Sequence, residues 1–589
     1  MALNSIKKIK IKIILAFLLL PSVASFGQNF LHREGQNIVD GNGKNVLLRG
    51  LGLGGWMVQE GYMLKTGDFA GPQYQIRQKI SDLIGEQNTN EFYSAYKANG
   101  ITKRDIDSLA IWGFNSVRLP MHYNLYTLPI EKEKVASDNT WLEEGFVMTD
   151  SLLNWCAANK MHLILDLHAA PGGQGKDANI SDYDTSKPSL WESKSNQDKM
   201  VAFWKKIASR YKDNPWIGGY DIINEPNWNF SGTNQNGCDE ALNVPLRELQ
   251  IRITKAIREV DTNHLLIIEG NCWGNNYKGI FPLWDENMAL SFHKYWNYNN
   301  EASIKEITDY RRDYNVPIWL GESGENSNVW FKEAISLVES NNIGWAFWPM
   351  KKIDNIAGVT SVTKTKGYDK LLSYWKDGKN KPSQEEAKKI LMEIANNYKM
   401  EHLSVKYDVI DAMFRQVYST ETKSFKKHAL PGKIFATEYD LGQINYAYFD
   451  KNDANYRVST GVNVEWNNGN QMRNDGVDIQ KCEDVITNEF NVTSIEDGEW
   501  LQYSVLLNED KAFDVVLRYS NANASGKVYL SDEKGNKISS TIELPFSGGI
   551  SKWKSIKIKN IALKKGNNKI RIYFEKGNFN LNYLDFLKK

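Results

Sequence analysis

Cysteine is scarce in this sequence, and neither sign of charge is in excess. Four cysteines among 589 residues are too few for a scaffold held together by disulfides. The 72 lysines and arginines almost cancel the 71 acidic residues. The chain therefore has no basic excess of the kind that binds nucleic acid by neutralising phosphates, and we expect no nucleic-acid partner.

The four cysteines also lack the spacing of metal ligands. Cys156 and Cys482 stand alone in the sequence. Cys238 and Cys272 fall in loops after two successive predicted strands, so a bridge between them and two free thiols are both open.

Long apolar runs are absent as well, because no stretch approaches the roughly 18 residues of a membrane-spanning helix. The short apolar run at residues 13–20 follows several lysines and precedes Pro21 and small residues, which is the order of a secretory signal peptide. We predict that residues 1–27 are a signal peptide and that the protein is secreted, to the extracellular space or the periplasm. We expect no stable membrane insertion.

Aromatic residues, in contrast, are abundant. Phe, Trp and Tyr make up 12% of the chain, with 19 Trp and 28 Tyr. Tyr and Trp combine an apolar ring face with a polar tip, so a surplus of them is typical of recognition surfaces. The hydrophobic content of 41% and the charged content of 24% are those of an ordinary globular protein.

From about residue 46 to 400, short apolar runs alternate with amphipathic helical stretches. Strands are predicted at 46–53, 115–119, 162–168, 217–223, 265–269, 288–293, 317–322 and 344–348, with helices at 145–159, 198–211, 240–260, 302–314 and 330–341. Eight strands with intervening helices are the count of a (β/α)8 barrel. The alternative, an open doubly wound sheet, would need a glycine-rich turn that opens a helix, and the glycines at 50–55 lead into no clear helix. We therefore predict an α/β fold of the TIM-barrel type.

The predicted barrel occupies residues 28–400 and includes a helix at 384–397 that closes it. A helical and polar linker follows at 401–430, with a helix at 403–416, and ends at the dipeptide Pro431-Gly432. Residues 431–589 contain short β-rich runs separated by Asn and Gly turns, without a helical period, which predicts a β-sandwich.

Two glutamates stand at the carboxyl ends of barrel strands, where the active site of such a fold lies. Glu225 lies in Asn-Glu-Pro after the fourth predicted strand, and Glu322 in Gly-Glu-Ser-Gly at the end of the seventh. They would face each other across the barrel mouth. Hydrolysis of a glycosidic bond needs such a pair, one carboxyl protonating the leaving oxygen and one carboxylate attacking the anomeric carbon.

These motifs resemble those of glycoside hydrolase family 5, over roughly residues 30–400. The resemblance implies that Glu225 is the acid/base and Glu322 the nucleophile of a retaining hydrolase that needs no catalytic cofactor. Ser323 departs from the Phe that many members carry. Residues 168–175 are most similar to the branch with exo-β-1,3-glucanases and β-glucosidases.

The same resemblance implies substrate-binding residues. Arg118 resembles a buried arginine that supports the nucleophile, and Trp348 resembles the platform beneath the sugar next to the cleaved bond. The family's polar residues that contact the sugar, the acid or the nucleophile match His168, Asn224, His293 and Tyr295.

Other side chains near strand ends are interpreted from the residues alone. Trp228, Trp273 and Trp296 follow strands and would line the cleft, where indole faces stack on sugar C–H groups. Glu269 and Glu325 are expected to be solvated loop residues, since most glutamates at strand ends are. Asp166, inside a strand, is expected to pair structurally with a neighbouring Arg or Lys.

Residues 431–589 resemble a carbohydrate-binding module of family 6, on stretches such as Asp-Gly-Glu-Trp-Leu-Gln-Tyr at 497–503. Family members are β-sandwiches with a structural calcium ion, and they bind glycans between two aromatic residues and an Asn. Here Phe490 and Asn580 match one aromatic and the amide, whereas Ile550 stands where a tryptophan platform is common.

Two further departures concern calcium. Phe435 and Thr437 stand where the family has acidic residues near the ion. Structural calcium and sugar binding by this module therefore both stay open, beside a role as a spacer that packs on the barrel.

Together these features predict a secreted retaining β-glucanase or β-glucosidase that acts on a polysaccharide or oligosaccharide as a monomer. Another β-linked glycan, such as mannan, xyloglucan or a glycolipid, is the alternative substrate. A catalytically silent glycan-binding protein is the alternative outside enzymes, and the intact glutamate pair argues against it. The β-1,3, β-1,4 or β-1,6 linkage and endo or exo action stay open.

Overall fold

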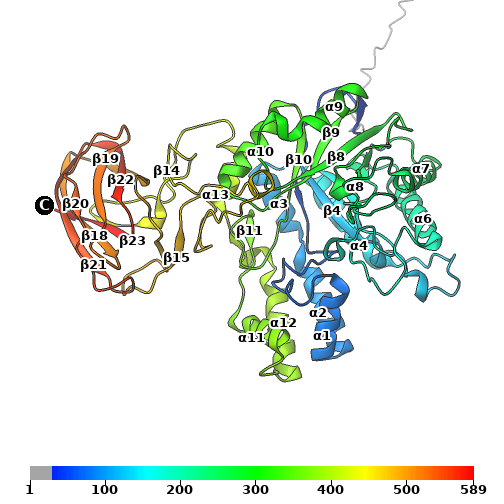
Figure 1. Cartoon of the computed structure of the whole chain (residues 1–589), viewed down its shortest axis with the longest axis horizontal. Coiled ribbons are helices and arrows are strands. Elements are labelled where there is room, and N and C mark those ends of the chain that lie inside the picture. The colour runs from blue at the N-terminus through cyan, green and yellow to red at the C-terminus, as the bar shows by residue number, and fades with distance from the viewer. Residues whose placement is uncertain (1–29) are drawn as a thin grey trace, which may run out of the picture.

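Eight parallel strands close into a barrel in the order β10-β3-β4-β5-β6-β7-β8-β9 (Figure 1). The structure, a computed structural model, describes residues 30–589, so the predicted signal peptide at 1–27 lies outside the described residues. The barrel strands are β3 (Arg49–Gly52), β4 (Ser116–His122), β5 (His162–Ala169), β6 (Ile217–Asp221), β7 (Leu266–Ile268), β8 (Met288–Lys294), β9 (Ile318–Gly324) and β10 (Gly344–Trp348). Each coincides with a predicted strand, so the TIM-barrel prediction is confirmed.

Helices surround the barrel, and hydroxyl side chains fix where several of them begin. Ser193 Oγ accepts the N–H of Asn196 at the start of α6, and Ser327 Oγ accepts that of Trp330 at the start of α10. The helices are α1 (Gln73–Ile84), α2 (Glu86–Gly100), α3 (Lys103–Trp112), α4 (Glu143–Ala158), α5 (Ala178–Ser181), α6 (Lys194–Tyr211), α7 (Val244–Arg258), α8 (Asn271–Gly274), α9 (Lys305–Asp313) and α10 (Asn328–Ser340). Within residues 30–589 no helix has the length and apolar content needed to cross a membrane.

The barrel interior is packed with side chains toward its amino-terminal end. A hairpin of β1 (His32–Glu34) and β2 (Asn37–Val39) lies there, and Ile38 joins Ile164, Ile267 and Trp319 in a buried cluster. A site for ligands is therefore expected at the opposite end, where the strands finish.

The helix α12 (Gln384–Asn397) does not close the barrel, contrary to the prediction. It packs on α1, α2 and α11 (Lys366–Asp377), because its apolar face finds a matching apolar face in that helical layer beside the barrel. Instead α13 (Tyr407–Phe414), within the predicted linker, packs on α10 and adds Val409 and Met413 to the barrel core.

The C-terminal region is a β-sandwich, as predicted. One sheet contains β13 (Gly432–Phe435), β15 (Ile479–Lys481), β16 (Phe490–Val492), β18 (Lys511–Ser520), β21 (Lys554–Leu563) and β23 (Asn580–Lys588). The other contains β14 (Tyr448–Phe449), β17 (Trp500–Leu507), β19 (Lys527–Asp532), β20 (Ile542–Glu543) and β22 (Gly566–Lys576). Alternate residues of β18, Phe513, Val515 and Leu517, point into the core between the sheets.

Candidate active site

A cleft of about 880 Å³ opens at the carboxyl ends of the barrel strands. Eight of the predicted site residues line it, namely His168, Glu225, Trp273, His293, Tyr295, Trp296, Glu322 and Trp348. Glu325, expected to be a solvated loop residue, also lines the cleft, where its half-buried side chain binds Lys352 at 2.7 Å. Arg118 and Asn224 are fully buried and are not among the lining residues. They therefore act on the site through other side chains, and the contact of Arg118 with Glu322 agrees with the support of the nucleophile that the resemblance implied.

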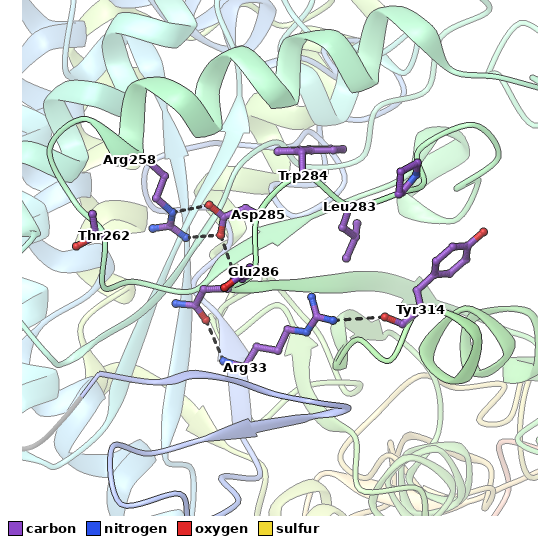
Figure 2. Close-up of a pocket in the computed structure, with 10 residues that line it drawn as sticks. Arg33, Arg258, Thr262, Leu283, Trp284, Asp285, Glu286 and Tyr314 are labelled. Carbon is purple, nitrogen blue, oxygen red and sulfur yellow. Dashed lines mark hydrogen bonds and ion pairs between the residues drawn. The ribbon is translucent and has the colours of Figure 1, made fainter.

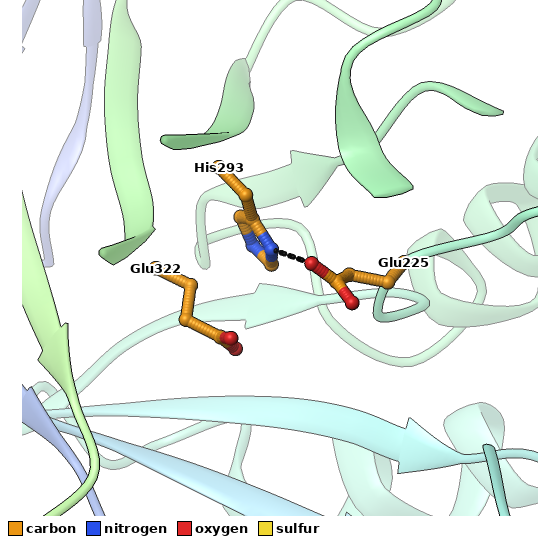
Figure 3. A group of neighbouring side chains, drawn as sticks. All are labelled: Glu225, His293 and Glu322. Atoms are coloured by element: carbon orange, nitrogen blue, oxygen red, sulfur yellow. Dashed lines mark hydrogen bonds and ion pairs between the residues drawn. The ribbon is translucent and has the colours of Figure 1, made fainter. Parts of the chain in front are cut away.

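The two glutamates face each other across this cleft (Figure 3). Glu225 follows β6 and Glu322 lies in β9, and a carboxylate oxygen of each lies within 4.8 Å of the other. Retaining glycosidases hold their carboxyl groups about 5–5.5 Å apart, whereas inverting enzymes leave roughly 6.5–9.5 Å for a water molecule. The separation therefore fits direct attack by one of the two glutamates.

Burial favours the protonated form of Glu225. Glu225 is only 5% exposed. Its burial, together with the charges of Glu322 and Glu269, raises the pKa of its carboxyl group. His293 partly opposes the rise, since its Nδ1 lies 2.6 Å from Glu225 Oε1. A carboxyl whose pKa is raised can keep its proton near neutral pH and donate it to a leaving group.

Glu322 is held by two hydrogen-bond donors instead. Arg118 donates to its Oε2 at 2.9 Å and the Tyr295 hydroxyl donates to its Oε1 at 2.7 Å. Burial and the Glu322 charge raise the pKa of Tyr295 well above its ordinary value, so this hydroxyl stays a donor. The two glutamates thus have the opposite environments that separate an acid from a nucleophile.

Glu269 is not a solvated loop residue, and that interpretation was wrong. Its side chain is fully buried at the end of β7, with Oε1 at 3.0 Å from Arg118 and 3.2 Å from His293 Nε2. These cations lower its pKa against the effect of burial. The strand-end rule that selected Glu225 applies equally to Glu269, and following it would have found this residue.

Glu269 also supports the backbone of the acid. Its Oε2 accepts the N–H of Glu225 at 2.7 Å, and Glu225 has a φ of 43°, which is in the left-handed region. A non-glycine residue held there costs of order 1–3 kcal/mol and persists only where neighbours fix it. The hydrogen bond to Glu269 is one such constraint.

Arg118 connects the carboxylates beneath the cleft. Its guanidinium donates to Asp221 and to Asn224 Oδ1, at 2.9 and 2.8 Å, and lies 3.2 Å from Asp166. Asp166 thus pairs with a neighbouring Arg, as expected from its place inside a strand. Burial opposes the charge of Arg118, but the surrounding carboxylates raise its pKa well above the ordinary value.

Another wall of the cleft combines charge with an aromatic face. The His168 ring stacks on Trp348, with ring centroids 5.0 Å apart. Burial alone would lower the pKa of His168, but Asp166 and Glu60 raise it to about 10. Burial raises the pKa of Glu60 to about 7, although His168 lowers it. Glu60 and Tyr62, in the loop after β3, were not found in the sequence because that loop has no regular pattern.

The three candidate tryptophans divide. Trp273 and Trp296 line the cleft, but Trp228 does not, because its ring is covered by Lys176 at 3.7 Å and contacts Tyr183. Trp228 is 6% exposed, so the prediction that it stacks on sugar is corrected.

Cys238 and Cys272 form a disulfide, which resolves the alternative that the sequence left open. Cys272 lines the cleft beside Trp273, in α8 after β7. The bridge therefore ties the loop that carries Trp273 to the loop after β6. Cys156 and Cys482 are free.

A metal-binding interpretation of the same cluster fits less well. Among residues 30–589, the atoms of Glu225, His293 and Glu322 are close enough to hold an ion. However, both ring nitrogens of His293 face carboxylates, and Glu269 and Glu322 raise its pKa well above the ordinary value although burial opposes this. A metal ligand must be a neutral imidazole, so the cluster suits proton transfer.

A second cavity, of about 820 Å³, lies at the other end of the barrel (Figure 2). It is lined by residues that precede β7 and β8, among them Thr262 and Asp285. Arg258 binds Asp285 at 2.8 Å, and Arg33 donates to the Asn315 carbonyl at 2.8 Å. This cavity faces the amino ends of the strands, so it is not the candidate active site.

The sandwich has a hollow of its own, of about 830 Å³, lined by Ile550 and Asn580 among others. Phe490 is not among its lining residues, and the aromatic residue that is, Phe579, is 2% exposed. Asn580 Oδ1 accepts a hydrogen bond from Thr493. The structure thus does not bring Phe490 and Asn580 together in this hollow.

The residues present do not fit a structural calcium ion at the family position. Phe435 and Thr437 supply no carboxylate there. Asp585, on the strand paired with β13, binds Lys433 at 2.8 Å. Calcium needs several oxygen ligands, usually including carboxylates, and these carboxylates are replaced or already paired.

Comparison with known proteins gives matches to both parts of the chain. Residues 78–353 match the family model of cellulase, glycosyl hydrolase family 5, and residues 468–588 match that of carbohydrate binding module family 6. A beta-xylosidase from Phanerodontia chrysosporium is 28% identical, over 58% of this chain and 74% of the relative. Endoglucanase C from Acetivibrio thermocellus is 24% identical, over 52% and 91%, and probable glucan 1,3-beta-glucosidase A from Aspergillus clavatus is 23% identical, over 46% and 61%.

Proposed function

From its glycosyl hydrolase family 5 domain and its family 6 carbohydrate-binding module, we propose that the chain hydrolyses β-glucosidic bonds of β-glucans with retention of configuration. The two family matches confirm both resemblances and an O-glycosyl hydrolase activity. Glu225 is the acid/base and Glu322 the nucleophile. The observation that carries the proposal is the pair of close carboxyl groups in opposite environments, within 4.8 Å of each other.

In the first step, a Glu322 oxygen attacks the anomeric carbon while the glycosidic C–O bond breaks. Glu225 gives its proton to the leaving oxygen, and a glycosyl ester forms on Glu322. In the second step, Glu225 takes a proton from water, the water oxygen attacks the same carbon, and the ester bond breaks. The sugar leaves with its original configuration, and both carboxyl groups return to their starting states.

The aromatic side chains of the cleft support a sugar ring as substrate. Trp273, Trp296 and Trp348 line the cleft and can stack on the C–H faces of pyranose rings. The endoglucanase and glucan 1,3-beta-glucosidase names of two relatives support a β-glucan. The beta-xylosidase name of the relative at 28% identity makes a β-xyloside the second candidate.

Export is part of the proposal. The predicted signal peptide at 1–27 supports it, and so does the disulfide between Cys238 and Cys272, since such bridges persist in oxidising compartments.

The test is a pair of variants, Glu322→Gln and Glu225→Gln, assayed on aryl β-glucoside, aryl β-xyloside, laminarin, pustulan, lichenan and cellulose. We expect Glu322→Gln to lower kcat/KM about a thousandfold or more on the substrate that the unsubstituted protein cleaves. Glu339→Gln is the matched control, because Glu339 also binds an arginine, Arg49, but on the outside of the barrel. Unchanged activity of Glu322→Gln would refute the assignment.

A further inference from the structure

A short helix from the C-terminal region, α14 (Arg457–Thr460), reaches the rim of the catalytic cleft. Val458 is among the residues that line the cleft, and the other lining residues belong to the barrel, between Glu60 and Lys352. Val458 is 63% exposed, so it offers an apolar surface at the rim and not at the reacting centre.

This helix contacts a tryptophan of the cleft directly. The N–H of Val458 donates to the carbonyl of Trp296 at 2.9 Å, and the Arg457 guanidinium lies 3.7 Å from the centroid of the Trp296 ring. The N–H of Tyr298 donates to Ser459 Oγ at 2.9 Å. Arg457 thus covers one face of the Trp296 ring, so a sugar can stack only on the ring face that the helix leaves open.

The residues before the helix anchor it to the barrel. Asn326 and Asn455 exchange two buried hydrogen bonds, Asn326 Nδ2 to the Asn455 carbonyl at 2.7 Å and the Asn455 N–H to Asn326 Oδ1 at 3.0 Å. Ala454 is buried in the barrel core, and the Tyr456 hydroxyl donates to Glu333 at 2.8 Å. Asn326 lies just after β9, which carries Glu322, so the anchor and the nucleophile share one segment.

A second set of buried contacts holds the loop around Asn474 and Asp475, through which the chain leads back to the sandwich. Asn328 Nδ2 donates to Asp475 at 2.9 Å and to Asp408 at 3.1 Å, and Asn474 donates through its N–H to Asp408 at 2.7 Å. Buried polar groups that satisfy one another fix a single arrangement. The sandwich is therefore joined to the barrel by buried hydrogen bonds, and Figure 1 shows β14 and α13 at the junction between the two.

From these contacts we propose that the sandwich domain completes the catalytic cleft, with Arg457 and Val458 as specificity-determining residues for sugar units beyond the one that is cleaved. Val458 and the open face of Trp296 pack on the C–H face of such a unit, and the guanidinium of Arg457 donates to its hydroxyl groups. The inference rests on the proposed function, since it concerns the same cleft, and it adds that neutral oligosaccharides of several units are the substrates.

The test compares Val458→Trp with Val462→Trp in the full chain. Both valines lie in the same exposed loop, 63% and 59% exposed, but Val462 does not line the cleft. Each variant is assayed on 4-nitrophenyl β-glucoside and on the β-gluco-tetrasaccharide that the unsubstituted protein cleaves fastest. We expect Val458→Trp to lower kcat/KM about tenfold on the tetrasaccharide and less than twofold on the aryl glucoside, mainly through KM.

Three results would overturn this inference. Equal effects of Val458→Trp on both substrates would show that the rim does not select among sugar units, and so would equal tetrasaccharide kinetics for the two variants. If the unsubstituted protein cleaves neither substrate, the proposed function fails, and the inference fails with it. Folding of each variant is measured separately by denaturant unfolding, so an equal loss of both activities counts against the inference when the variant unfolds as the unsubstituted protein does.

Discussion

The pH dependence of hydrolysis should depend on His293, and the direction can be derived from its contacts. Glu225 must be protonated to act as an acid, so the basic limb of kcat/KM against pH reports its pKa in the free enzyme. The hydrogen bond and the positive charge of His293 lower that pKa, while burial, Glu322 and Glu269 raise it. His293→Gln removes the positive charge and leaves Glu269 unopposed, so both consequences raise the pKa of Glu225 further.

The size of the effect follows from the 2.6 Å between His293 Nδ1 and Glu225 Oε1. At an effective dielectric constant of about 20, unit charges at that distance attract by about 6 kcal/mol, which is an upper bound because Glu269 shares the charge of His293. Opposite charges in such contact shift carboxyl titrations by roughly 1–3 pH units. We therefore expect the basic limb of His293→Gln to move upward by about one pH unit or more.

The assay is kcat/KM for phenyl β-glucoside between pH 4 and 10, because phenolate leaves poorly without a proton. His264→Gln is the control, since His264 is equally buried but binds Asp261 on the barrel wall, away from the cleft. A basic limb of His293→Gln that stays in place, or moves to lower pH, would refute the reasoning.

Two further predictions concern the nucleophile and the disulfide. Tyr295→Phe removes the 2.7 Å hydrogen bond to Glu322. Because a hydrogen bond to a charged group contributes roughly 1.5–3 kcal/mol, we expect kcat on the aryl glucoside to fall about tenfold with little change in KM. An unchanged kcat would contradict the role of Tyr295. The double variant Cys238→Ser/Cys272→Ser opens a loop closed by cysteines 34 residues apart in the sequence. We expect denaturant unfolding to show a free energy of unfolding lower by about 3–4 kcal/mol, and we expect a higher KM because Trp273 is released. Equal stability of the variant and the unsubstituted protein would contradict this prediction.

Much of the fold could be predicted from local patterns. Short apolar runs identified all eight barrel strands, because parallel strands are buried on both faces. The strand-end rule then selected Glu225 and Glu322. The same rule applied to Glu269, but a single glutamate was taken to be solvated, since nothing in the sequence shows that Arg118 and His293 lie close enough to pair with it.

Positions that depend on contacts between distant segments could not be predicted. Trp228 follows a strand just as Trp273 does, and only the packing of Lys176 on its ring removes it from the cleft. The helix α12 has an apolar face that suits a barrel, yet α1 and α2 cover that face instead.

The sequence by itself determined the barrel, the sandwich and the pair of glutamates, because periodicity and strand-end motifs are local properties. The tertiary structure decided the different surroundings of the two carboxyl groups: burial and the charges of Glu322 and Glu269 raise the pKa of Glu225, and Arg118 donates a hydrogen bond to Glu322. It also decided that Val458 of the C-terminal region lies at the cleft beside Trp296. Electrostatic interaction and packing depend on the distance between side chains in space, and the positions of residues along a chain of 589 do not give that distance.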